Sequence, residues 1–204
     1  MKERDWLSKN NSQMQNLLRK FAKQLPPDQV GRRYTRAELI QDIEFLHKTI
    51  KDVHPNPFFS CSEDSFNREI ENCISRLGDD SSRIEFYKEV AKLVSLIHDG
   101  HTTVHLPYEE YAQHKESGGK FFPYSVDCSS GEAVITECLA DSQIVSPGDV
   151  LIRINGITVS DILEEMKSLF GYEREAMKLS VVSGKFSWLH FILYGAHDQY
   201  SLVV

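Results

Sequence analysis

Long apolar runs, a secretory leader and an excess of basic charge are all missing from this 204-residue chain. No apolar run approaches the roughly 20 residues of a membrane-spanning helix, and the N-terminus lacks the apolar core of a signal peptide. We therefore expect no membrane span. The missing leader favours the cytoplasm, although an extracytoplasmic location stays open because a leader could precede Met1. The net charge of −7 argues against a nucleic-acid partner, since phosphate binding needs a clustered basic face.

Paired cysteines are missing as well. The four cysteines form no Cys-x-x-Cys pair, which favours buried thiols in a reducing compartment and leaves a disulfide open. Hydrophobic residues make up 41% and charged residues 26% of the chain, so it should bury a sizeable core as one large or two small domains. Nothing in the sequence indicates a cofactor. The cysteines are Cys61, Cys73, Cys128 and Cys138.

Apolar residues recur every three or four positions in the first half of the chain, which predicts amphipathic helices. Thr35-Arg36-Ala37-Glu38 and Ser82-Arg83-Ile84-Glu85 have capping-box spacing, so a helix should begin at each. The predicted helices cover residues 5–25, 35–53, 62–77 and 82–97. Those between 35 and 98 are joined by short connections and should form a small helical bundle.

Strand and turn signals dominate after residue 106. Residues 122–128 and 132–138 should pair as a hairpin, and Asn155-Gly156 suits a tight type I′ turn. The predicted fold class is therefore α+β, with an N-terminal helical bundle followed by a mixed α/β domain. The remaining expected elements are a mobile loop or frayed helical turn at 107–120, a helix capped by Ser160, a mostly helical segment at 173–195 and a strand at 199–204.

The junction between the two halves, residues 93–105, holds the main candidate for chemistry. Asp99-Gly100 should end the helix, because glycine readily adopts the left-handed conformation that closes a helix C-terminus. Alternating residues from His101 to His105 predict a strand, so His101 would be held at a rigid corner. Asp99 or Thr103 could orient its imidazole. The alternative is a capped helix end with polar turn residues and no catalytic role.

Two other histidine arrangements deserve comparison with that candidate. His98, His101 and His105, with Asp99, have spacings that could gather a metal. We predict no metal site, because His98 would end a helix while the other two would lie on a strand. His54 precedes a proline at a helix end, and we expect it to bond backbone carbonyls rather than to act in catalysis.

Two motifs resemble a known peptidase family. The segment Ser146–Phe170, with its run Pro-Gly-Asp-Val-Leu-Ile-Arg-Ile-Asn-Gly, resembles a PDZ domain of the bacterial protease type. The preceding half, with His-Pro-Asn at 54–56 and Asp-Gly-His-Thr at 99–102, resembles the region before the PDZ domain in tricorn and C-terminal-processing serine peptidases. The resemblance covers roughly residues 35–204. It implies that His101 is the general base in the tricorn-like branch, whereas a lysine takes that role in the processing branch.

The family's serine nucleophile is not recognisable in this sequence. That residue belongs to an α/β core domain that follows the PDZ domain, and the chain has no Gly-x-Ser-x-Gly elbow. We therefore expect an N-terminal fragment of a serine-type endopeptidase, a hydrolase of peptide or protein substrates that needs a core domain of the same polypeptide. The alternative is a non-enzymatic peptide- or protein-binding module. The expected divisions are 1–34 (helix and linker), 35–106 (helical bundle ending in the Asp-Gly-His-Thr corner) and 107–204 (PDZ-like domain, substrate-binding or regulatory, and the start of the following domain).

Overall fold

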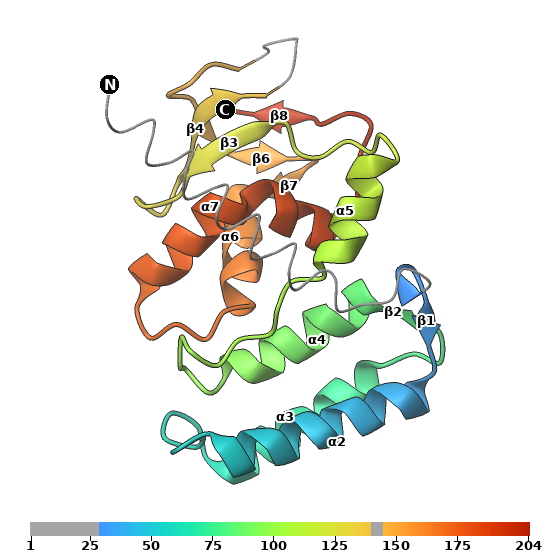
Figure 1. The fold of residues 1–204 in the computed structure, drawn as a ribbon. Coiled ribbons are helices and arrows are strands. Elements are labelled where there is room, and N and C mark those ends of the chain that lie inside the picture. The colour runs from blue at the N-terminus through green and yellow to red at the C-terminus, as the bar shows by residue number, and fades with distance from the viewer. Residues whose placement is uncertain (1–28, 140–144) are drawn as a thin grey trace, which may run out of the picture.

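The computed structural model describes residues 29–139 and 145–204, and the helix predicted at 5–25 lies outside them. Figure 1 shows a helical layer below a part that mixes helices with small antiparallel sheets. The predicted α+β class is confirmed. The helical layer consists of β1 (Arg33–Tyr34), α2 (Arg36–Val53), α3 (Glu63–Arg76), β2 (Ser81–Ser82) and α4 (Arg83–Ser95).

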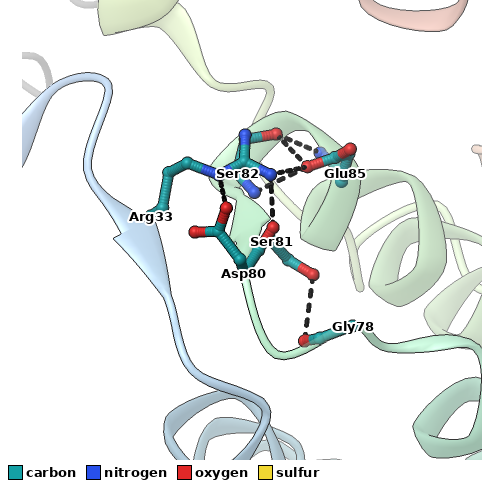
Figure 2. Close-up of polar contacts among 6 residues, drawn as sticks. All are labelled: Arg33, Gly78, Asp80, Ser81, Ser82 and Glu85. Carbon is teal, nitrogen blue, oxygen red and sulfur yellow. Dashed lines mark hydrogen bonds and ion pairs between the residues drawn. The ribbon is translucent and has the colours of Figure 1, made fainter.

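The starts of the helices in this layer are fixed by local capping. Both predicted capping boxes form, at Thr35 for α2 and at Ser82 for α4. Arg33 adds a longer-range contact, because its guanidinium pairs with the Asp80 carboxylate at 2.9 Å and lies 3.5 Å from that of Glu85 (Figure 2). The antiparallel β1–β2 pair is thereby joined to the first turn of α4.

The second part of the chain is built on two three-stranded antiparallel sheets, ordered β3-β4-β5 and β7-β6-β8. The predicted hairpin is confirmed as the β3–β4 pair. The second predicted turn is confirmed too, since Asn155 and Gly156 have φ values of 50° and 85° between β6 and β7. The elements are α5 (Tyr108–Glu116), β3 (Tyr124–Asp127), β4 (Ala133–Cys138), β5 (Val150–Leu151), β6 (Arg153–Ile154), β7 (Ile157–Thr158), α6 (Val159–Ser168), α7 (Glu175–Tyr194) and β8 (Leu202–Val203).

Helix α4 belongs to both hydrophobic clusters of the described chain. Val90, Leu93 and Ile97 pack with residues of α2 and α3, including the fully buried Phe66. Tyr87, on another face of α4, packs into the larger cluster formed by the sheets with α6 and α7. Helix α4 is therefore packed on two sides, and the segment that follows it begins at a well-packed helix end.

Three local predictions need correction. Residues 107–120 contain the regular helix α5, because Tyr111 stacks on Phe121 with ring centroids 4.3 Å apart and packs against Trp188 of α7. The cap of α6 is Thr158 rather than Ser160, since the Thr158 hydroxyl accepts the hydrogen bond from the Asp161 N–H. The final strand is limited to Leu202–Val203, where it pairs with β6.

The described helices do not include one with the length and apolar character required to cross a membrane. The four cysteines, all within the described residues, form no disulfide with one another: Cys73 and Cys128 are buried, whereas Cys61 and Cys138 are partly exposed. Burial raises the pKa of the Cys73 and Cys128 thiols to about 11. These two cysteines therefore behave as apolar packing residues rather than as reactive thiolates.

Candidate functional site

The site lies where α2 and α4 end side by side. Figure 1 shows these two helices running in the same direction while α3 runs back, and residues of all three pack in one cluster. His54 is the C-cap of α2, with φ −76° and ψ 128°, and its backbone N–H still donates to the Ile50 carbonyl at 2.9 Å. Pro55 explains this ending, because a residue before proline is pushed out of helical geometry.

The end of α4 differs from the prediction. Its last turn tightens after Ser95, and the residue in the left-handed region is His98, with φ 52°, rather than Gly100. Left-handed backbone costs a non-glycine residue about 1 kcal/mol, so the surrounding contacts must hold His98 there. The turn that it starts is closed by the Thr102 N–H, which donates to the Asp99 carbonyl at 3.0 Å.

Gly100 is required by a close approach rather than by its own φ angle. A Cβ atom at this position would lie 2.6 Å from the Cδ1 atom of Tyr172, which belongs to the segment between α6 and α7. Gly171, next to Tyr172, is similarly close to the end of α4, because a Cβ there would lie 3.1 Å from the Ser95 carbonyl oxygen. The second part of the molecule therefore packs directly on the Asp99–His101 turn.

The Asp99 carboxylate is the centre of the site. Its Oδ1 accepts hydrogen bonds from the His101 backbone N–H at 2.9 Å and from His101 Nδ1 at 3.1 Å. Its Oδ2 accepts from the Thr102 hydroxyl at 2.9 Å and pairs with His54 Nε2 at 3.0 Å. A carboxylate has about four lone-pair sites, so all of them are in use. The His101 N–H, and after it the Thr102 hydroxyl and the two imidazoles, hold the Asp99 pKa far below its usual range despite partial burial.

His101 is held by one side of its ring and open on the other. Since ionised Asp99 can only accept, the Nδ1 atom of His101 must carry the hydrogen, which leaves a lone pair on Nε2 when the ring is neutral. The side chain is 99% exposed. An oriented imidazole with an accessible, unprotonated Nε2 can take a proton from a hydroxyl group brought to it.

The chain around His101 is not the strand that the alternating residues predicted. Residues 103–107 have no regular secondary structure and pair with no strand in the described part of the molecule. The corner is therefore fixed by the Asp99 hydrogen bonds and by the Tyr172 contact, and Asp99 rather than Thr103 orients the ring.

The other candidates are not brought into this site. Within residues 29–139 and 145–204, no three His, Cys, Asp or Glu side chains are arranged to hold a metal ion. Ser183 lies inside α7, where its hydroxyl donates to the Leu179 carbonyl and accepts from the Cys128 N–H. None of the hydroxyl groups in the described ranges forms a hydrogen bond with His101 Nε2.

His54 is the site residue whose environment was predicted wrongly. It contacts the Asp99 carboxylate 45 positions away and accepts the Asn56 N–H at Nδ1, rather than bonding backbone carbonyls. A periodicity argument cannot find such a contact, because it depends on how α2 and α4 pack. The His-Pro-Asn motif was the one available signal.

Comparison of the chain with protein-family profiles, with curated proteins and with solved structures found no match.

Proposed function

We propose that this chain supplies the general base of a serine-type peptidase, with His101 as the base and Asp99 as the residue that orients it. The single observation that carries the proposal is the pairing of a fully exposed imidazole with an ionised carboxylate through Nδ1. A base must lie within about 3 Å of the hydroxyl that it deprotonates, and histidine is suited to this role near neutral pH.

The proposal places the serine nucleophile on a further segment of the same polypeptide. A histidine alone does not cleave a peptide, because acyl transfer also needs a nucleophile and donors for the oxyanion. The exposure of His101 supports this arrangement, since the face that carries Nε2 is accessible to such a segment. The mixed α/β part would act as a PDZ-like substrate-binding or regulatory module, and its Tyr172 packs on Gly100, the residue before the base.

A reagent that reacts with activated serines tests the proposal. The 204-residue chain alone should hydrolyse no casein-type substrate and should not be labelled by a fluorophosphonate probe. The polypeptide that includes the nucleophile should be labelled, and His101→Ala should slow labelling by orders of magnitude, because the serine then lacks its base. His105→Ala, which changes another exposed histidine four residues on, is the matched control and should label at the wild-type rate.

A second candidate, a non-enzymatic peptide-binding module, rests on a different observation. Val150, Ile152 and Val203 expose 37%, 53% and 46% of their surface on strands β5 and β8 and the link between β5 and β6, and exposed apolar patches often mark binding surfaces. No fluorophosphonate labelling of the polypeptide that should include the nucleophile would favour this candidate over the peptidase.

A further inference from the structure

The His54 imidazole reaches the site from a different helix than the residues around it. Asp99, His101 and Thr102 belong to one turn, and their mutual hydrogen bonds are local. Among the hydrogen bonds of the described residues, the 3.0 Å contact between His54 Nε2 and Asp99 Oδ2 joins this turn to the end of α2. The His54 side chain is only 16% exposed, so water competes poorly for this hydrogen bond.

The hydrogen on His54 can be assigned from its second contact. The Asn56 backbone N–H donates to Nδ1 at 3.1 Å, so Nδ1 must carry a lone pair. In the neutral ring the hydrogen is then on Nε2, where it points at Asp99. His54 therefore donates to the carboxylate from one side, while His101 donates to it from the other.

We propose that His54 is a positioning residue, which through Asp99 fixes the orientation and the Nδ1–H tautomer of His101. With Oδ2 occupied by His54 and Thr102, the carboxylate cannot rotate without losing hydrogen bonds, and Oδ1 stays opposite His101 Nδ1. Without the His54 hydrogen bond, the plane of the carboxylate is held by the Asp99–Thr102 turn alone. The exposed ring of His101 then becomes free to adopt the other tautomer and other rotamers.

The proposal deepens the proposed function, on which its catalytic meaning rests, but it makes a claim about this chain that needs no peptidase activity. Long-range ¹H–¹⁵N correlation spectra of the imidazole rings distinguish Nδ1–H from Nε2–H. In the wild-type chain the His101 signals should show the Nδ1–H form. This readout reports the tautomer of His101 and does not change when a distant contact merely loosens the fold.

Two variants at position 54 separate positioning from packing. The His54→Asn side chain can accept the Asn56 N–H but is too short to reach Asp99, and it should move the His101 signals toward the Nε2–H form. His54→Gln places an amide N–H near the position of Nε2 and should restore the Nδ1–H form. Lys51→Ala removes the Lys51–Glu63 ion pair at the same end of α2 without touching Asp99, and it should leave the spectrum unchanged.

The outcomes are distinct. A folded His54→Asn chain in which His101 keeps the wild-type tautomer overturns the proposal, and so does a Lys51→Ala chain with the same shift as His54→Asn. If His54→Asn does not fold, failure of His54→Gln to retain the Nδ1–H form also overturns it. Failure of the proposed function would give a different result. His101→Ala would then keep full turnover, while the spectra of the wild-type and His54 variant chains would still show the expected tautomers.

Discussion

Acid should weaken this fold in a specific way, through a histidine remote from the Asp99 site. His190 of α7 is 2% exposed, and its Nδ1 has no hydrogen-bond partner in the described part of the chain. Burial among aromatic rings, and to a smaller extent the neighbouring His197, lowers the pKa of His190 from 6.5 to about 4. The rings that lie around it belong to Phe122, Phe186, Tyr194, His197 and Tyr200.

The sign of the effect follows from which state binds the proton more tightly. Between pH 6.5 and 4 the unfolded chain binds a proton at His190 and the folded chain does not, so acid favours unfolding. The stabilisation is complete above pH 6.5 and is lost as the pH falls toward 4. One pKa unit corresponds to about 1.4 kcal/mol, so the full difference is about 3 kcal/mol, most of which should be gone by about pH 4.5. The Asp99 contribution is lost only at lower pH, below its ordinary pKa of 3.8.

Urea unfolding at a series of pH values measures the contribution of His190 to the free energy of unfolding. The free energy of unfolding of the wild-type chain should fall by about 2 to 3 kcal/mol more than that of His190→Phe between about pH 7.5 and 4.5. Phenylalanine fills the aromatic site and removes the titration, so the difference between the two profiles isolates His190. Parallel profiles for the two proteins would show that His190 does not cause the loss of stability in acid.

The remaining predictions concern stability and can be checked by urea or thermal unfolding. Gly100→Ala should destabilise by about 1 to 3 kcal/mol, because its Cβ would displace the Tyr172 ring, and the loss should be smaller in a Tyr172→Ala background. Gly184→Ala, in the open middle of α7, should stabilise the fold by up to about 1 kcal/mol, and a loss of stability would show that a side chain does not fit there. Thr158→Ala should cost about 1 kcal/mol as loss of a helix cap, while Ser160→Ala should be nearly neutral; the reverse order would restore the sequence-based assignment.

Elements decided within a few residues were predictable from the sequence. The capping boxes at Thr35 and Ser82 form because the two partners are three positions apart on the same turn. The Asn155-Gly156 turn forms because both residues tolerate positive φ. In each case the segment needs no information from the rest of the chain.

Elements that depend on packing between distant segments could not be predicted from the sequence. Residues 103–107 have the alternation of a strand, but a strand also needs a neighbour with which to pair, and the sequence does not show whether one is available. Residues 107–120 were predicted as a mobile loop or a frayed helical turn because Pro107 and the Gly118-Gly119 pair flank the segment, but between them α5 is a regular helix whose aromatic residues dock on α7. In both cases the outcome depends on the neighbouring elements, which the local sequence pattern does not identify.

In the candidate site too, local contacts could be predicted from the sequence and contacts that depend on packing could not. The candidate base His101 and the orienting role of Asp99 could be predicted from the sequence, because the two residues lie two positions apart. The His54 contact could not be predicted, since it joins the ends of two helices that are brought together by a shared core. The Tyr172 contact was missed for the same reason, because Gly100 alone does not identify which side chain covers it.

If His101 acts in catalysis and not in folding, as we propose, His101→Ala should change turnover while leaving stability almost unchanged. The melting temperature of the variant chain should stay close to that of the wild type, because an exposed substitution usually changes stability by less than about 0.5 kcal/mol. In the polypeptide that includes the nucleophile, turnover should fall by orders of magnitude, as it does when a base is removed from a base–nucleophile pair. A collapsed melting temperature, or turnover that survives the substitution, would show His101 to be structural and favour a lysine as the base.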